Sequence, residues 1–254
     1  MYVACSTNCF AKYPLEKALR TIHELEFSKV DVVIDERGPH LKPSEVVADV
    51  AGAAQKLRIG PGLSPAAFSV NIQATGEEDY QRQLHAICRL ARQSLVPVLT
   101  IAAGTIGGGM DAEVQRLGKL VKLTEKEGIV LTVSTQMGTL TETPEASVDL
   151  CQRVPGLGLT LDPSHFIAGP HQGKSFDIVF PYVRHVHLRD TGKAPNQFQV
   201  RVGQGEIEYG RIVSQLTRYH FERVLTVDIR DIADAPFAME PEVRKLKYLL
   251  ESLV

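Results

Sequence analysis

The sequence predicts an α/β protein that forms one single (β/α)8 TIM barrel over residues 1–254. Short β-rich runs alternate with longer segments of helical periodicity along the chain, which is the pattern of βαβ units with a parallel sheet. Eight such pairs of roughly 32 residues each fill the chain and match the usual size of this barrel. With 254 residues, 44% of them apolar, the chain can bury one large core.

The eight expected strands are short, and several of them are apolar on both faces, as buried parallel strands are. They are YVACS (2–6), KVDVVI (29–34), RIGPGL (58–63), PVLTIAA (97–103), IVLTVS (129–134), LGLTLD (157–162), HVHL (185–188) and VLTVDI (224–229).

Segments with apolar residues at helical spacing separate the strands and would form the outer ring. They include LEKALRTIHELEF (15–27), EVQRLGKLVKLTEKEG (113–128), GRIVSQLTRYH (210–220) and EVRKLKYLLESL (242–253). Thr143 is a good N-cap, with Pro144 at the first helical position of the next helix. Lys126 and Gly128 are suited to end the preceding helix.

The composition favours a small-molecule partner and a cytoplasmic location. Lys plus Arg (28) nearly balance Asp plus Glu (30), so nothing predicts attraction to nucleic acid or to an anionic membrane surface. No apolar run approaches the roughly 20 residues that span a bilayer, and MYVACSTNCF lacks the features of a signal peptide. The four cysteines lack the spacing of a zinc ribbon and fit a reducing compartment.

Three strand-like runs in the C-terminal half each end in a side chain that can bind a metal ion. The runs are LTLDPSH (159–165), VRHVHLRD (183–190) and VLTVDIRD (224–231), and the side chains are Asp162, His187 and Asp228. In a parallel barrel the C-terminal ends of the strands meet at one mouth, so these three donors would converge there. A fourth run of the same build, GIVLTVSTQMG (128–138), ends in Ser134.

Each of these residues also has a purely structural interpretation. Asp162 precedes Pro163, and an aspartate at the end of a strand often caps the following turn. His185 and His187 share one face of their strand, and a buried histidine is more often hydrogen-bonded in a core than bound to metal. The recurrence in three successive strands is what favours a metal site.

The motifs LDPSHF, VRHVHLRD and GQGEIEYGRIV resemble the sugar phosphate isomerase/epimerase superfamily, also called xylose isomerase-like TIM barrels. This superfamily includes ketose 3-epimerases, hydroxypyruvate isomerase and endonuclease IV. The resemblance implies a divalent ion held by Glu, Asp, His and Glu after strands five to eight. The matching positions in this chain are Ser134, Asp162, His187 and Asp228. It also implies that His165 contacts a substrate oxygen and that Gln136 lies beside the substrate.

The resemblance implies a reaction in which a proton moves at the carbon beside a carbonyl, while the metal stabilises the enediolate. Two departures bear on this reaction. Ser134 brings neither the negative charge nor the base of the family glutamate, and Asp228 is one methylene shorter than glutamate. We therefore expect the ion (Mn, Mg, Co or Zn) to bind weakly or not at all, and Ser134→Glu to tighten binding of Mn²⁺ or Co²⁺.

The remaining acid/base candidates are Asp228, His165 and, in the loop after the second strand, Asp35 and Glu36. Asp35 and Glu36 follow the second strand, where they form either a solvated turn or, for Glu36, a substrate contact. The long segment 189–206 after the seventh strand would cover the mouth of the barrel. Its candidates for holding the substrate are Asp190, Lys193, Arg201 and Gln204. For Lys193, Arg201 and Gln204, a position on the surface away from the substrate is an equal alternative.

Three functions compete. The first is a metal-assisted sugar (phosphate) isomerase or epimerase that acts on a small polyhydroxylated or keto substrate, with a homodimer as an allowed assembly. The second is a catalytically degenerate barrel that serves as a small-molecule binding or auxiliary protein, which Ser134 favours. The third, a DNA-repair nuclease, is disfavoured by the balanced charge and the missing glutamate. A Schiff-base aldolase would need a lysine on an inner strand position, and none of the eight runs has one there.

Overall fold

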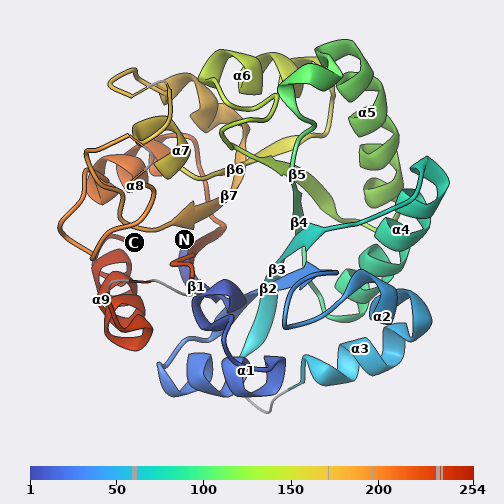
Figure 1. Ribbon diagram of the computed structural model, residues 1–254, viewed down its shortest axis with the longest axis horizontal. Coiled ribbons are helices and arrows are strands. Elements are labelled where there is room, and N and C mark those ends of the chain that lie inside the picture. The colour runs from blue at the N-terminus through green and yellow to red at the C-terminus, as the bar shows by residue number, and fades with distance from the viewer. Residues whose placement is uncertain (59–61, 171, 196, 233–234, 236) are drawn as a thin grey trace.

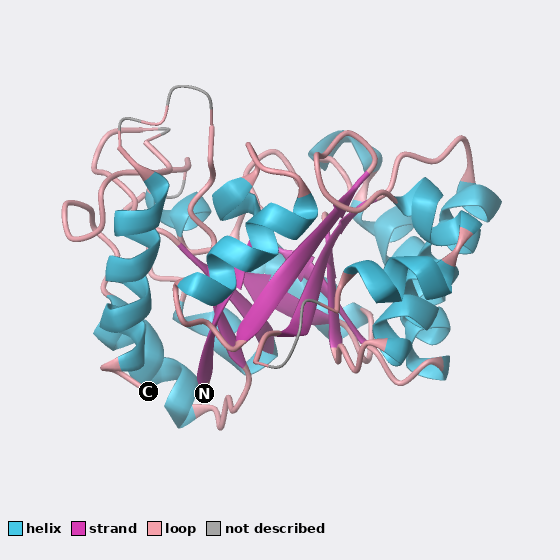
Figure 2. Cartoon of the chain, turned by 90° about the horizontal axis from the view of Figure 1, so that it is seen from below, coloured by secondary structure: helices cyan, strands magenta, loops and turns pink. Residues whose placement is uncertain are grey.

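The computed structural model describes residues 1–254 except 59–61, 171, 196, 233–234 and 236. Within the described residues, eight parallel strands close into a barrel in the order in which they occur along the chain. Helices surround the strands on all sides (Figure 1). The two ends of the chain lie near each other, and the strands are tilted inside the ring of helices (Figure 2). The predicted single (β/α)8 barrel is confirmed.

The strands are short, and each pairs with the next in parallel register, β1 closing the barrel against β8. They are β1 (Tyr2–Ser6), β2 (Lys29–Asp35), β3 (Ser64–Asn71), β4 (Val98–Ile101), β5 (Val130–Ser134), β6 (Gly158–Leu161), β7 (Val183–Leu188) and β8 (Val224–Val227).

The outer layer consists of α-helices joined in places by short 3-10 turns. The α-helices are α1 (Leu15–Glu24), α2 (Pro43–Ala48), α3 (Val50–Lys56), α4 (Glu77–Gln93), α5 (Met110–Lys126), α6 (Pro144–Arg153), α7 (Ser164–Ile167), α8 (Tyr209–Arg218) and α9 (Met239–Glu251). The 3-10 turns are η1 (Thr7–Phe10), η2 (Ile106–Gly108) and η3 (Asp177–Tyr182).

The capping predictions for α5 and α6 are confirmed. The Thr143 hydroxyl accepts a hydrogen bond from the backbone N–H of Ala146 at 3.0 Å, with Pro144 in the first turn of α6. Gly128 follows α5 with φ +73°, a conformation that glycine adopts without strain, and its N–H donates to the Glu125 carbonyl.

The third strand predicted over 58–63 is wrong. Residues 59–61 of that range lie outside the described residues, and the observed strand is Ser64–Asn71, which pairs with β2 from Lys29↔Ser64 onward. RIGPGL is apolar, but its Gly-Pro-Gly is typical of a turn, and Gly62 has φ +117°. The prediction gave too much weight to the apolar residues of this stretch and too little to its turn-forming glycines and proline.

The core lies mainly between the strands and the helices, where the buried apolar side chains form one large cluster. Inside the barrel, a second cluster of small side chains comes from strands β1, β3, β4 and β8: Ala4, Ala66, Ala67, Val98 and Val224. Polar side chains fill the rest of the interior toward the C-terminal ends of the strands. This polar part contains the candidate site.

In the part of the chain that the structure describes, no helix has both the length and the apolar character needed to cross a membrane. The expected cytoplasmic location stays a prediction.

Candidate active site

A cavity of about 500 Å³ opens at the mouth of the barrel, at the C-terminal ends of the strands. Its lining contains seven of the residues that the sequence singled out: Asp35, Ser134, Gln136, Asp162, His165, His187 and Asp228. The barrel thus brings the predicted ligand positions from strands five to eight to one cavity, as parallel strand ends do. Ser134 and Gln136 also contact each other, Oγ to Oε1 at 3.4 Å.

Asp162 is held by the turn that follows it. Its Oδ1 accepts hydrogen bonds from the Ser164 N–H at 3.1 Å and from the Ser164 hydroxyl at 2.5 Å. Pro163 has φ −66°, which suits the start of the short helix α7. The turn-capping interpretation is therefore correct for Oδ1, while Oδ2 stays available for another partner.

That partner is Arg189, the residue directly after β7. Its Nη2 donates to Asp162 Oδ2 at 2.6 Å, and its Nη1 donates to Asp228 Oδ2 at 3.4 Å. All three side chains are at most 4% exposed. We call Asp162, Arg189 and Asp228 the mouth cluster.

Both carboxylates of the mouth cluster are ionised. Burial raises the pKa of Asp162, but the charges of Arg189, His165 and Arg230 and the hydrogen bond from Ser164 together outweigh it and lower that pKa below its ordinary value. For Asp228, burial again raises the pKa, and His187, Arg230 and Arg189 together lower it far more. Asn8 adds a hydrogen bond from Nδ2 to Asp228 Oδ1 at 3.3 Å.

His187 is oriented by a buried carboxylate from the opposite side of the barrel. Its Nε2 lies 2.8 Å from Oδ2 of Asp31 in β2, and Ser69 in β3 donates to both oxygens of that carboxylate. The bond to Asp31 places the Nε2 proton and leaves Nδ1 toward Asp228 Oδ2, 3.9 Å away. Burial lowers the pKa of His187, but the hydrogen bond to Asp31 and the charge of Asp228 outweigh this, so that the net pKa is raised.

A neutral layer lies below these charged groups. The hydroxyl of Thr160 lies 2.8 Å from that of Thr100 and 2.7 Å from that of Thr132. His185 joins them through Nδ1 to Thr100 at 3.1 Å and through Nε2 to Thr226 at 2.8 Å. Burial lowers the pKa of His185 to about 3, so it is neutral. We call Thr100, Thr132, Thr160, His185 and Thr226 the threonine layer.

His165 lies on α7 at the side of the cavity, with its ring against Phe198 at 5.0 Å between centroids. The Met137 N–H donates to its Nδ1 at 3.4 Å, and Nε2 lies 3.6 Å from Asp162 Oδ2. Burial lowers the pKa of His165, so the imidazole is neutral near pH 7 and can accept or donate a proton.

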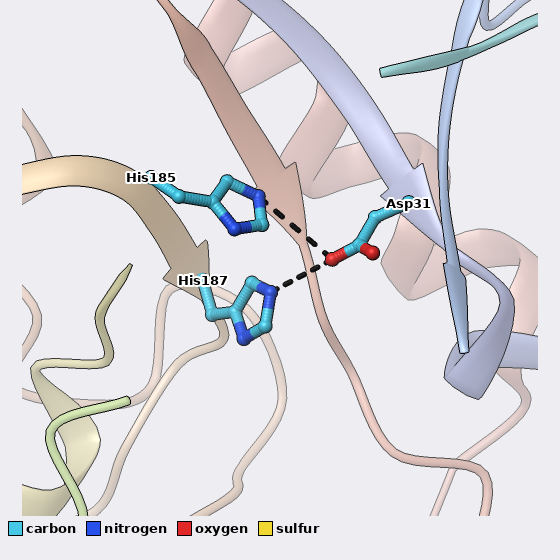
Figure 3. A group of neighbouring side chains, drawn as sticks. All are labelled: Asp31, His185 and His187. Atoms are coloured by element: carbon cyan, nitrogen blue, oxygen red, sulfur yellow. Dashed lines mark hydrogen bonds and ion pairs between the residues drawn. The ribbon is translucent and has the colours of Figure 1, made fainter. Parts of the chain in front are cut away.

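One group of side chains in the described residues could hold a metal ion by distance. The ligand atoms of Asp31, His185 and His187 all lie within 4.8 Å of one another, and both imidazoles face the same oxygen of Asp31 (Figure 3). The chemistry of this group is that of a hydrogen-bonded network. Both nitrogens of His185 already face threonine hydroxyls, and 2.8 Å from His187 to Asp31 is a hydrogen-bond distance.

The predicted ligands Asp162, His187 and Asp228 do not form such a group, since their ligand atoms are not all within 4.8 Å of one another. Both carboxylates bind the Arg189 guanidinium, and Ser134 adds no charge. In this arrangement Asp162 and Asp228 bind the positively charged side chain of Arg189, and the three predicted ligands are not placed to bind a divalent metal ion.

The two candidates after β2 have different positions. Asp35 lines the cavity, where its Oδ2 accepts from Asn71 Nδ2 at 3.2 Å. Glu36 directly follows β2 and accepts hydrogen bonds from the N–H and the hydroxyl of Ser44 at the start of α2. These hydrogen bonds lower the pKa of Glu36, and the side chain is not part of the described cavity lining.

Asp190 organises the long segment after β7. Its Oδ2 accepts from the N–H groups of Gly203 and Gly205 at 2.6 and 3.1 Å, and its Oδ1 accepts from the Thr191 N–H. A Cβ at Gly205 would lie 2.2 Å from Asp190 Oδ1, so only glycine fits there. The GQG of the sequence motif thus wraps the segment around a buried carboxylate.

The other candidates of this segment lie on its surface. Lys193 pairs with Glu206 at 3.2 Å and its side chain is 81% exposed. Arg201 and Gln204 are exposed as well. None of the three belongs to the described lining of the cavity.

The sequence reasoning missed Asp31 and Arg189. Asp31 sits in the middle of β2, and its charge in the apolar run KVDVVI was the available signal, because a buried ionised group needs a partner. Arg189 follows His187 in VRHVHLRD, and an arginine next to predicted acidic ligands could have been recognised as their ion-pair partner.

The sequence model of one protein family, described as the xylose isomerase-like TIM barrel, matches residues 19–249. The chain belongs to this family. Among curated proteins, no sequence matches this xylose isomerase-like barrel significantly.

Solved structures with the same fold cover nearly the whole of this xylose isomerase-like barrel. One is a xylose isomerase-like TIM barrel protein from Mycobacterium smegmatis in complex with magnesium, with TM-score 0.77, 15% identity, and coverage of 99% of this chain and 97% of that one. Another is the IOLI protein with a zinc atom, with TM-score 0.77, 16% identity, and coverage of 100% and 99%. A third is an L-ribulose 3-epimerase, with TM-score 0.71, 13% identity, and coverage of 100% and 96%. Structural neighbours therefore include metal-bound barrels and a sugar epimerase.

Proposed function

We propose that this barrel is a sugar isomerase or epimerase that moves a proton on a small polyhydroxylated or keto compound. The observation that carries the proposal is the cavity of about 500 Å³ that gathers Asp162, His165, His187 and Asp228 at the barrel mouth. A cavity of this size suits a compound of a few carbon atoms, and its lining is rich in groups that bind hydroxyls. The family and its epimerase relative support the reaction class.

In the proposed reaction, His165 exchanges a proton with the substrate, and Asp228 orients the substrate. The neutral imidazole of His165 can take the proton from a carbon beside a carbonyl, which leaves an enediolate. The lowered pKa of Asp228 keeps it ionised but makes it the weaker base, so it orients the hydroxyl beside the reacting carbon. Delivery of a proton to the opposite face of the same carbon, from solvent in the open cavity, gives an epimer, and return of the proton by His165 to the neighbouring carbon gives an isomer.

Polar groups of the cavity would hold the substrate and the enediolate oxygen. Asn8 and Gln136 offer amide groups, and the Arg230 guanidinium lies 3.9 Å from Asp228 Oδ2 on the cavity wall. Donors that face a developing oxyanion stabilise it more than they stabilise the neutral carbonyl. The predicted divalent ion stays a prediction, and no step is assigned to it.

A second candidate function is a small-molecule binding or auxiliary protein. Ser134 favours it, since the side chain at the position of a family glutamate is neutral and bonded only to Gln136 among the described contacts. In that case the cavity would bind a sugar-like compound without turning it over.

Solvent exchange separates the two functions. The full-length protein is incubated in D₂O with a panel of pentuloses, hexuloses and hydroxypyruvate, and the C–H signals are followed by NMR, with and without Mn²⁺. Deuterium at the carbon beside the carbonyl, followed by an epimer or isomer, is the expected result. If no compound exchanges but one of them raises the melting temperature, the binding function replaces the proposed reaction.

A further inference from the structure

The guanidinium of Arg189 occupies the space between the two carboxylates that end β6 and β8. Nη2 contacts Asp162 Oδ2 at 2.6 Å and Nη1 contacts Asp228 Oδ2 at 3.4 Å, so each carboxylate meets a different nitrogen of the same planar group. The side chain is only 3% exposed, and water therefore screens these pairs little.

Two further N–H groups of Arg189 are also engaged. Its Nε donates to the Phe198 carbonyl at 3.1 Å, and its Nη2 donates to the Ser164 hydroxyl at 2.7 Å. These contacts come from α7 and from the long segment after β7, and they fix the plane of the group. A fixed, buried guanidinium with four of its five N–H groups hydrogen-bonded is a permanent part of the site and not a mobile surface charge.

The charge of the site differs from the one that a divalent ion would require. The ligand set that the family resemblance implies has three negative charges, from two glutamates and one aspartate. The set at the same positions in this chain has two, from Asp162 and Asp228, because Ser134 and His187 add no negative charge. Arg189 offsets one of these two at the contact distances given above. A doubly charged ion placed beside the guanidinium would meet repulsion that the neutral Ser134 does nothing to reduce.

We propose that Arg189 is the built-in counter-cation of Asp162 and Asp228, and that it takes the place of a divalent ion at the mouth of the barrel. It is a positioning residue, since it acts through the two carboxylates. The binding assay below uses no substrate, so its result is independent of the proposed reaction.

The experiment measures Mn²⁺ binding and thermal stability of the chelator-treated, full-length protein. Isothermal titration is performed on the wild type, on Arg189→Met, which keeps most of the side-chain volume, and on Arg189→Lys, which keeps the charge. The melting temperature of each is recorded with and without Mn²⁺.

The wild type should bind Mn²⁺ weakly and melt at the same temperature in its presence and absence. Arg189→Met should melt lower without metal, bind Mn²⁺ at least ~10-fold more tightly, and recover stability when Mn²⁺ is added, because two unpaired carboxylates then bind the ion. Arg189→Lys should bind Mn²⁺ as weakly as the wild type. A purely structural role would lower the melting temperature without creating metal binding.

Equal or weaker Mn²⁺ binding by Arg189→Met than by the wild type would overturn the proposal. If Arg189→Met does not fold, the double variant Arg189→Met/Asp162→Asn decides, since it restores the net charge of the mouth cluster. Recovery of folded protein in the double variant supports the counter-cation role, and no recovery contradicts it.

Discussion

The threonine layer and the mouth cluster are neighbouring polar regions inside one barrel, and water barely reaches either of them. Thr160 precedes Asp162 by two residues, His185 precedes Arg189 by four, and Thr226 precedes Asp228 by two, so the same strands supply both regions on the same face. The residues of the threonine layer are neutral and hydrogen-bond one another, and Thr100 among them also lines the cavity. The residues of the mouth cluster are charged, and Asp162 and Asp228 line the cavity.

The difference shows what each region contributes. Threonine hydroxyls both donate and accept, so the threonine layer satisfies its buried polar groups without charge. The mouth cluster keeps ionised groups out of water, which costs free energy that Arg189 offsets. The two carboxylates of the mouth cluster lie beside the cavity, where charge can act on a ligand.

The largest expected effect is on the mouth cluster. Asp162→Ala should lower the free energy of unfolding by about 3–5 kcal/mol, because it leaves a buried guanidinium without its closest partner. Urea unfolding at pH 7 measures this loss. The exposed pair Arg211 and Asp177 is the control, and Asp177→Ala should cost less than about 1 kcal/mol. Equal losses in the two variants would show that burial of the charges does not matter.

The second effect concerns acid stability and comes from the threonine layer. The pKa of His185 is about 3 in the folded protein against 6.5 ordinarily, so its stability contribution is complete above pH 6.5. As the pH falls below 6.5, the unfolded chain takes up a proton that folded His185 refuses, and stability declines toward pH 3. Between pH 7 and 4.5 the wild type should lose about 2–3 kcal/mol more than His185→Gln. Urea midpoints at both pH values test this, and parallel losses would refute a neutral, buried His185.

The third effect is a loss of stability when one hydroxyl group is removed from the threonine layer. Thr160→Val should cost about 1–2 kcal/mol of unfolding free energy, since the hydroxyls of Thr100 and Thr132 lose their shared partner. Thr217→Val on the surface of α8 is the matched control, with an expected change within about 0.5 kcal/mol. Any loss of ligand binding in Thr160→Val at unchanged stability would mean that the layer is part of the site.

The smallest effect tests a residue at the rim. Glu36→Gln weakens the hydrogen bonds to Ser44 at the start of α2 and should cost less than about 1 kcal/mol. The melting temperature of Glu36→Gln is compared with that of a control, Glu45→Gln, which removes an exposed ion pair with Lys56. A change in turnover without a change in stability would instead make Glu36 a substrate contact, as its position after β2 predicted.

The sequence was enough for the barrel because its signals are local. Alternating strand and helix patterns, Thr143 with Pro144 and the Gly128 helix end each depend on a few adjacent residues. The strand prediction for RIGPGL was wrong for the same reason, because its apolar residues favour a strand whereas its Gly-Pro-Gly favours a turn. Eight units closed in chain order left the topology with little freedom.

The sequence predicted only those site residues that lie at the ends of strands and point to the same face by the two-residue period of a strand. Strand-end positions identified Asp162, His187 and Asp228, and they do border one cavity. The pairing of Arg189 with two carboxylates depends on the rotamer of a long side chain, and the bond from Asp31 to His187 joins residues 156 positions apart. Neither contact leaves a local pattern in the chain.

The central claim is that the mouth of the barrel carries proton transfer while the threonine layer below it only supports the fold. The most direct test is deuterium exchange from D₂O into the best compound of the panel, compared among the wild type, His165→Gln, Asp228→Asn and Thr226→Val. The account predicts that exchange falls at least ~100-fold in the first two variants and stays within ~3-fold of the wild type in Thr226→Val. Wild-type exchange in both His165→Gln and Asp228→Asn, with intact folding, would contradict it.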